Sequence, residues 1–201
     1  MDSEDYSHLP MNERLEIGAN YYQKKIVHAL EKQNVHIVLA NDYHTDAILK
    51  IDGYLNGDTN LPVQIKHRRT SQKNRNDLAF EVCRNHKFNQ KIINQLKNEY
   101  QKGRDYKGSS VVYYFLLNKD ETCIHQICSD LIRKNIHETI EEHESSNQNG
   151  YLSKKYLAKN GTELIATKDN DSKSFTPRKV MAFIPVEGIS VKTYDIISRP
   201  N

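Results

Sequence analysis

The 201-residue sequence lacks a long hydrophobic run. No stretch approaches the roughly 20 consecutive apolar residues of a membrane-spanning helix, so a transmembrane protein is not expected. The N-terminal residues are acidic and carry no apolar segment like that of a secretory signal, which predicts a cytoplasmic protein. Glycine-rich phosphate loops and ATPase motifs are also missing, so nothing indicates a reaction driven by nucleotide hydrolysis.

Cysteine is scarce as well. The three cysteines, Cys83, Cys123 and Cys128, are an odd number without the spacing of a disulfide framework, which suits a reducing compartment. Cys123 and Cys128 flank His125, a pattern that could hold zinc, but no second pair of ligands follows at zinc-finger spacing. The sequence therefore predicts buried structural thiols rather than a metal centre.

Excess charge of one sign is small, because the net charge is only +3. Its distribution is uneven, however. Between Lys66 and Lys107 the chain carries twelve cationic and four acidic side chains, so the remaining segments are together acidic. A solvated loop and helix could produce this pattern, but it favours a surface that faces phosphates.

Hydrophobic periodicity predicts helices and strands in alternation. The run at 109–118 is apolar throughout and of strand length, which is typical of a buried central strand. Residues 69–77 are expected to form a polar loop, and Ser129 is expected to cap a helix that follows a short strand. The other predicted elements are a helix at 12–33, strands at 35–41, 44–55 and 61–68, a helix at about 85–102, a hairpin within 151–168, and one or two strands within 180–197.

This order predicts an α/β protein with a central mixed β-sheet flanked by helices. No repeat or low-complexity linker divides the chain, so residues 1–201 are expected to form a single domain. Within it, residues 12–135 would form the core, and residues 145–201 would form a β-rich C-terminal extension.

Two predicted neighbouring strands could carry chemistry on one shared face. Gln64 and Lys66 are two residues apart, so both side chains lie on one side of their strand. Asp46 and Asp52 likewise share a side of the preceding strand. An aspartate opposite a Gln-X-Lys pair is an arrangement that suits Mg²⁺ and phosphodiester hydrolysis. Asp52 precedes Gly53 and is more typical of a bend, so Asp46 is the first choice and Asp52 the alternative.

These residues resemble the PD-(D/E)XK nuclease superfamily, whose pattern is an acidic residue opening the second strand and Asp/Glu-X-Lys on the third. Thr45-Asp46 stands in place of the Pro-Asp pair, and Gln64-Ile65-Lys66 stands in place of Asp/Glu-X-Lys. The Gln-X-Lys variant is similar to that of Mrr-type restriction enzymes. The resemblance covers about residues 12–70 and implies a restriction-endonuclease-like core.

The resemblance also implies roles for individual residues. Asp46 and Gln64 would bind Mg²⁺, which Mn²⁺ could replace, and the main-chain carbonyl of Ile65 would complete the protein ligands. Lys66 would orient the attacking water or stabilise charge on the phosphate. The first helix often supplies a glutamate, for which Glu16 is the first choice, while Gln23 is closer to the place that simple members use.

The cationic segment after Lys66 would hold nucleic acid. Arg68, Arg69, Lys73 and Arg75 would contact phosphates, and Gln72, Asn74 and Asn76 could reach base edges. The expected function is thus a restriction-like, magnesium-dependent endonuclease that cuts duplex DNA, as a homodimer. Because the Gln64 amide is uncharged, a non-catalytic nucleic-acid-binding protein that retains the fold is one alternative. A nuclease directed to RNA or to a particular nucleic-acid structure is another.

Overall fold

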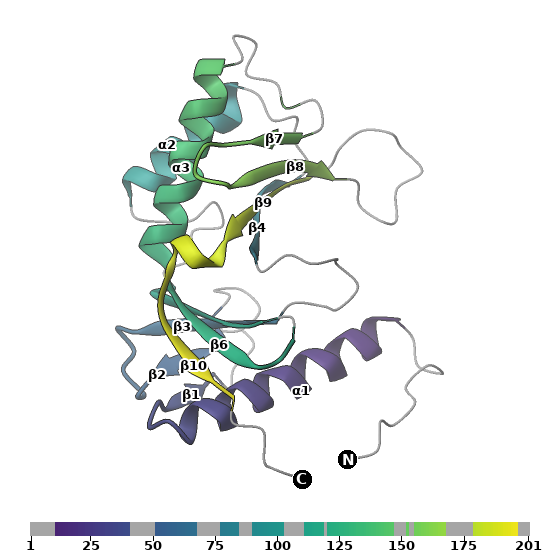
Figure 1. Ribbon diagram of the computed structural model, residues 1–201, viewed down its shortest axis with the longest axis vertical. Helices are drawn as coiled ribbons and strands as arrows, with labels where there is room; N and C mark the ends of the chain where they lie inside the picture. Colours follow the sequence, from purple (N-terminus) through teal and green to yellow (C-terminus); the bar gives the residue numbers. More distant parts are fainter. Residues whose placement is uncertain are drawn as a thin grey trace.

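Two β-sheets lie one above the other along the longest axis of the molecule, with α2 and α3 beside the second sheet and α1 against the first (Figure 1). The computed structural model describes residues 11–40, 51–67, 77–84, 90–102, 111–118, 120–146, 152, 155–167 and 179–196, apart from the side chains of residues 11–17, 19 and 84.

The described residues form three α-helices, ten strands and one short 3₁₀ helix. In chain order they are α1 (Met11–Glu31), β1 (Ile37–Leu39), β2 (Gly53–Leu55), β3 (Pro62–His67), β4 (Asp77–Arg84), α2 (Gln90–Gln101), β5 (Tyr113–Leu117), β6 (Cys123–Cys128), α3 (Ser129–Ser146), β7 (Lys155–Leu157), β8 (Glu163–Thr167), β9 (Lys179–Pro185), η2 (Val186–Gly188) and β10 (Ser190–Asp195).

The first sheet has six strands in the order β1-β2-β3-β5-β6-β10. The strands β1, β2 and β3 form an antiparallel meander, and β3 then pairs with β5 in parallel. Because a parallel pair needs a crossover connection, the chain passes through β4 and α2 before it returns as β5. The sequence-based prediction of an α/β protein with a mixed sheet is confirmed.

Hydrophobic residues cover both faces of this sheet. On one face Ile26 and Leu30 of α1 pack with Phe115 and Leu117 of β5. On the other face the neighbouring β5 residues Tyr114 and Leu116 belong to a larger cluster with α2, α3 and the second sheet. Since β5 is covered on both sides, its sequence is apolar throughout, as the prediction of a buried central strand required.

The second sheet is antiparallel, with the order β4-β9-β8-β7. It joins β4, which lies between β3 and β5 in the chain, to three strands that follow α3. After β9 the chain passes through η2 and enters the first sheet as β10, beside β6. The predicted C-terminal extension thus contributes strands to both sheets.

Sequence periodicity did not reveal β4. The predicted polar loop ends at Asp77, but the structure places Asp77 at the buried start of β4, opposite Pro185. The register shifts between Glu81 and Cys83, and Val82 and Cys83 are both buried. A bulge of this kind interrupts the alternation of buried and exposed residues by which a strand is recognised.

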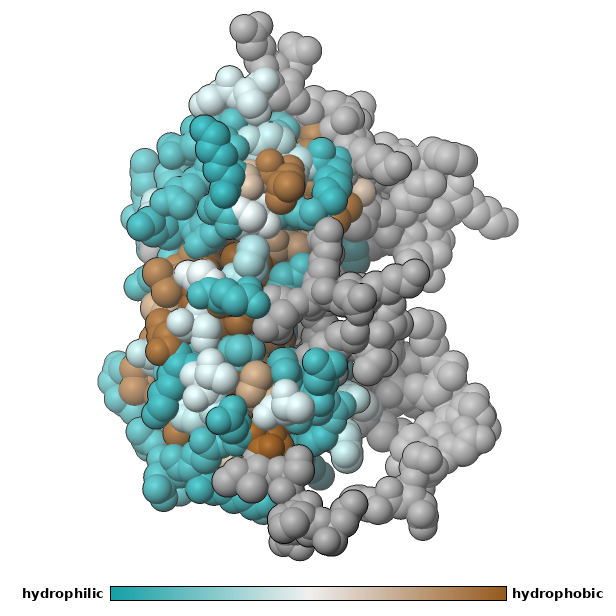
Figure 2. Space-filling model, viewed as in Figure 1, coloured by the Kyte–Doolittle hydropathy of each residue, from teal (hydrophilic) through white to brown (hydrophobic). Residues whose placement is uncertain are grey.

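No helix within the described ranges is long and apolar enough to cross a membrane. Figure 2 shows hydrophilic residues over much of the described surface on this side, with hydrophobic residues gathered near mid-height.

Candidate active site

The Gln-X-Lys sequence lies in β3, inside the first sheet. Gln64 pairs with Tyr114 and Lys66 pairs with Leu116 of the parallel strand β5. Tyr114 and Leu116 belong to the hydrophobic cluster that reaches the second sheet, so Gln64 and Lys66 share the face on that side. Both polar residues are half-buried. The prediction that they lie on one side of a strand is confirmed.

Asp52 lies directly before β2 and contacts the centre of this motif. Its Oδ2 accepts a hydrogen bond of 2.5 Å from the main-chain N–H of Ile65. Its own N–H donates to the carbonyl of Val63 at 2.9 Å, and its carbonyl accepts from Ala40 at 3.0 Å. The carboxylate therefore takes the place of a main-chain acceptor at the end of the β2–β3 ladder, and three hydrogen bonds hold Asp52 between β1 and β3.

Gly53 allows this close approach of the strands. A β-carbon at this position would lie 2.6 Å from the main-chain oxygen of Val38 and 2.9 Å from a side-chain carbon of Ile37. Both atoms belong to β1, which pairs with β2 through Leu39 and Gly53. A residue without a side chain is thus required immediately after Asp52.

A second group of side chains surrounds the end of β3. The ring of His67 stacks on the ring of Tyr22 from α1, with centroids 4.0 Å apart and an interplanar angle of 16°. Tyr22 also donates a hydrogen bond to Glu121, which forms an ion pair with Lys25. Burial of Tyr22 raises the pKa of its phenol, and the charge of Glu121 and the hydrogen bond to it raise that pKa further. These contacts hold the last residue of β3 against α1.

The turn between β5 and β6 presents Glu121 to α1. Glu121 has a φ of 56°, in the left-handed region that residues with a side chain rarely adopt. The side-chain oxygen of Asn118 accepts hydrogen bonds from the N–H groups of Thr122 at 2.8 Å and Cys123 at 3.0 Å, which holds the turn in this conformation.

Several predicted site residues lie outside the residues that the structure describes. Asp46 is one of them, and Glu16 lies in α1 with its side chain outside the described atoms, so their roles stay predictions. Gln23 is half-buried, one residue after Tyr22. The predicted nucleic-acid contacts that lie outside the described residues are Arg68, Arg69, Gln72, Lys73, Asn74, Arg75 and Asn76.

Part of the cationic stretch after β3 is engaged elsewhere in the fold. Lys97 of α2 forms an ion pair with Glu144 of α3, and Gln90 donates to the same carboxylate at 2.6 Å. These two hydrogen bonds and the positive charge of Lys97 lower the pKa of Glu144. Lys97 therefore ties α2 to α3, whereas the sequence pattern had indicated a surface facing phosphates.

Asp52 and β3 carry donor atoms of the kinds that a hard divalent cation accepts. Asp52 supplies a carboxylate, Gln64 an amide oxygen and Ile65 a main-chain carbonyl, which are ligand types that Mg²⁺ and Mn²⁺ accept. Across the residues that the structure describes, no three His, Cys, Asp or Glu side chains lie close enough to hold an ion. Among the three donors named here, the Asp52 carboxylate is charged and the other two are neutral oxygens.

The sequence-based prediction ranks Asp52 below Asp46, and it treats Tyr22 as a core or interface residue and not as part of the site. The length of the β2–β3 hairpin could have indicated Asp52, because it sets which residue of the first strand lies opposite Gln64. The observed pairs Gly53–Val63 and Tyr54–Pro62 continue, one step further, to Asp52 beside Gln64. The stack of Tyr22 on His67 joins a helix to a strand far along the chain, and nothing in the local pattern indicates it.

Comparisons with protein-family models, with curated proteins and with solved structures found no significant match to this chain.

Proposed function

We propose that the protein is a metal-dependent endonuclease of the PD-(D/E)XK type that hydrolyses phosphodiester bonds of duplex DNA. The contact between the Asp52 carboxylate and the Ile65 N–H carries this proposal. It joins an acid that directly precedes the second strand to the Gln64-Ile65-Lys66 motif of the third strand. The antiparallel meander followed by a parallel strand also agrees with a central mixed sheet that holds such a motif.

Each side chain would have a separate task. Asp52, Gln64 and the carbonyl of Ile65 would hold Mg²⁺ or Mn²⁺, and when bound such an ion polarises a phosphoryl oxygen and acidifies water. The Lys66 ammonium, on the same face as Gln64, would orient the attacking water and stabilise negative charge that develops on the phosphate. Because the Gln64 amide is neutral, this site would bind a divalent ion less tightly than one with two carboxylates.

Nicking of a supercoiled plasmid in Mg²⁺ or Mn²⁺ tests this function. We expect Asp52→Ala and Lys66→Ala each to lower the cleavage rate on the order of 10²–10³-fold, because each removes a charge that acts in the transition state. Asp58→Ala is the matched control. Asp58 is an exposed acid in the turn between β2 and β3, where its side chain accepts a hydrogen bond from the N–H of Asn60, and its loss should leave the rate unchanged.

Three outcomes would contradict the proposal or part of it. A wild-type protein that binds DNA and never nicks it would indicate the non-catalytic alternative, and preferential cleavage of RNA competitors would indicate an RNA-directed enzyme. If Asp46→Ala abolished cleavage and Asp52→Ala did not, Asp46 would be the metal-binding acid. The variant Gln64→Glu provides a further test. A second carboxylate should bind Mg²⁺ more tightly and so lower the Mg²⁺ concentration needed for the half-maximal cleavage rate.

We also propose that the active species is a homodimer, since cleavage of both strands of a duplex is served by two symmetry-related sites. The molar mass in solution, measured by light scattering with and without DNA, tests this. A monomer that breaks both strands in one binding event would contradict it.

A further inference from the structure

A thiol and an imidazole meet on β6, on the same face of the first sheet as Gln64 and Lys66. The strand β5 lies between β6 and the strand β3 that carries those two residues. Cys123 and His125 are two residues apart on this strand, so both point to one face of the sheet. The Sγ atom of Cys123 lies 3.5 Å from Nε2 of His125. Both side chains are half-buried. The sequence-based prediction of buried thiols is confirmed for Cys83 and is wrong for Cys123 and Cys128, which are both half-buried.

The spacing of these two atoms matches that of two ligands on one tetrahedral ion. A Zn–S bond of about 2.3 Å and a Zn–N bond of about 2.0 Å, at a tetrahedral angle, separate sulfur from nitrogen by about 3.5 Å. The pair therefore has the distance that zinc coordination requires without any displacement of the strand.

A third side chain orients the imidazole. Nδ1 of His125 is 3.1 Å from Oγ1 of Thr193, which is the residue opposite His125 on β10. In metal sites the second ring nitrogen of a ligating histidine is usually held in this way, and the contact directs the other nitrogen to the metal. Here it directs Nε2 to the sulfur of Cys123.

The nearest acid on the neighbouring strand is also in register. Asp195 of β10 lies directly opposite Cys123. Paired residues of antiparallel strands have Cα atoms about 4.5–5.5 Å apart, which is within reach of a shared ligand after a side-chain rotation. The negative charges of Asp195 and Asp120 act on Cys123, and that of Glu187 acts on His125, so the local potential favours a cation.

We propose that Cys123, His125 and Asp195 form a binding site for Zn²⁺ or a similar thiophilic divalent ion. Thiolate and imidazole select such ions over Mg²⁺, so this site is distinct in its chemistry from the proposed nuclease site and does not depend on it. As the described side chains stand, no three of them converge closely enough for a metal, so Asp195 must rotate toward the thiol when the ion binds.

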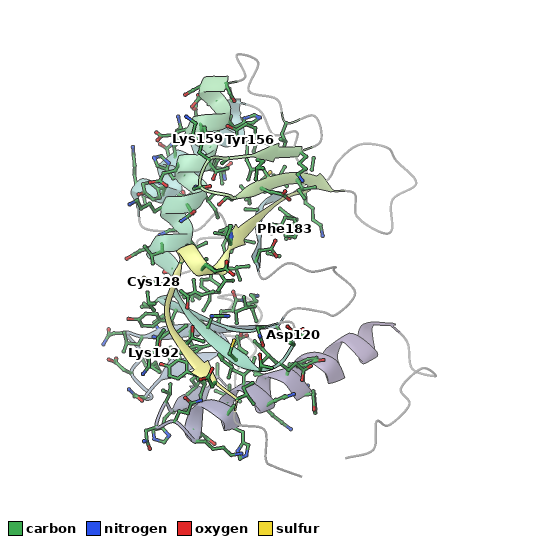
Figure 3. All side chains as sticks on the ribbon, viewed as in Figure 1. Asp120, Cys128, Tyr156, Lys159, Phe183 and Lys192 are labelled. Atoms are coloured by element: carbon green, nitrogen blue, oxygen red, sulfur yellow. The ribbon has the colours of Figure 1, made fainter. Side chains whose placement is uncertain are left out.

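Cys128 provides an internal control on the same strand. It pairs with Tyr113, which packs on the α1 side of the sheet, so Cys128 faces away from Cys123 and His125. Figure 3 shows Cys128 where β6 meets α3, whereas Asp120 lies at the opposite end of β6, near α1. Cys123, His125 and Cys128 thus cannot bind one ion together, although their spacing in the sequence suggests it.

Titration of the zinc-free full chain with Co²⁺ tests the proposal. We expect thiolate-to-cobalt charge-transfer absorption and the visible bands of tetrahedral Co²⁺ in the wild type and in Cys128→Ser. Cys123→Ser should lose the charge-transfer band, and His125→Gln should lose the tetrahedral spectrum. Thr193→Val should weaken binding by about 10–100-fold, because it releases the imidazole. Zn²⁺ should displace Co²⁺, and excess Mg²⁺ should not.

A simple thiol–imidazole hydrogen bond is the competing explanation of the geometry. It would be established by a wild-type protein that shows no charge-transfer absorption with Co²⁺. A band that persists in Cys123→Ser, or that disappears in Cys128→Ser, would also overturn the proposal. Circular dichroism of each variant shows that it is folded, and Cys123→Ala replaces Cys123→Ser if the latter is not.

Discussion

The absence of a side chain at Gly53 allows β1 and β2 to approach closely beside the candidate active site. Gly53 follows Asp52, whose carboxylate binds the N–H of Ile65. A β-carbon at residue 53 would come within 2.6 Å of the Val38 carbonyl, a distance that such contacts do not reach. Any side chain here must push β1 away from β2, and Asp52 would move with β2.

We predict that Gly53→Ala destabilises the fold by about 1–3 kcal/mol, as overpacking of a well-packed site does. It should also lower nicking activity more than its effect on stability explains, because Asp52 would be displaced. Urea unfolding and the plasmid assay measure the two effects. Gly188→Ala is the control, because a β-carbon there meets no atom within 4 Å. Equal stability of the two variants would contradict the prediction.

His143 links protonation to stability at a buried position of α3. Its side chain packs edge-to-face against Tyr156, with ring centroids 4.9 Å apart. Burial lowers the pKa of this imidazole from its ordinary value of 6.5. The folded state therefore keeps His143 neutral at pH values where the unfolded chain already binds a proton.

We predict that the free energy of unfolding falls as the pH is lowered below about 6.5, because the unfolded state then binds more protons than the native state. Urea unfolding between pH 7.5 and 5.5 measures this change. In His143→Phe, which retains an aromatic ring and cannot be protonated, the change should be smaller. Some of it should remain, since burial also lowers the pKa of His125. An unaltered pH dependence in His143→Phe would refute the assignment.

At the scale of elements, polar side chains dock the β7–β8 hairpin onto α3. Oδ1 of Asn160 accepts a hydrogen bond of 2.9 Å from the N–H of Thr162, and its Nδ2 donates to the carbonyl of Asn135 at 3.3 Å. Thr139 and Thr162, which flank this network, are fully buried. The Glu142 carboxylate accepts from the hydroxyl of Tyr156 and from the N–H of Lys159.

We predict that Asn160→Ala destabilises the protein by about 1–3 kcal/mol, because it removes the acceptor of the N–H of buried Thr162 and the hydrogen bond to the α3 carbonyl of Asn135. Lys159→Ala is the matched control in the same turn (Figure 3), since Lys159 contacts Glu142 through its main-chain N–H and its side chain is exposed. Thermal unfolding compares the two. Comparable losses in both variants would show that the network contributes little.

Elements held by local patterns were the ones that could be predicted. The helix α1 and the strand β5 have periodicities that their packing explains, and both were predicted close to their observed bounds. The strand β4 was missed because its partner is β9, far along the chain, and because a bulge breaks its alternation. Pairing with a strand far along the chain produces no periodic pattern in the sequence around β4.

The candidate site divides in the same way. Its motif on β3 follows from period-two alternation, which the sequence displays directly. The choice between Asp46 and Asp52 depends on hairpin register, and the Tyr22–His67 stack depends on how α1 packs on the sheet. Both depend on contacts between segments that are separate in the sequence. A tyrosine in a helix is usually a core residue, so its type alone does not indicate the stack with His67.

Over the whole molecule, the chain passes back and forth between the two sheets. The chain leaves the first sheet after His67, enters the second sheet at β4 and returns through α2. It leaves again after α3 and returns as β10. Gln64 and Lys66 lie on the face of the first sheet whose hydrophobic cluster extends into the second sheet. The second sheet thus lies on the side of the first sheet that carries these two residues.

Because the chain passes twice between the two sheets, neither sheet can be completed early during synthesis on the ribosome. The strand β9 joins β4 to β8, and β10 closes the β6 edge of the first sheet, so both sheets are incomplete until residues 179–196 have emerged. Until then β4 lacks its partner while Leu78 and Val82, buried in the finished protein, are uncovered. Nascent chains with such unpaired strands are prone to aggregate. The Gln64-Ile65-Lys66 motif on β3 would thus gain its stable surroundings only after residues 179–196 have emerged.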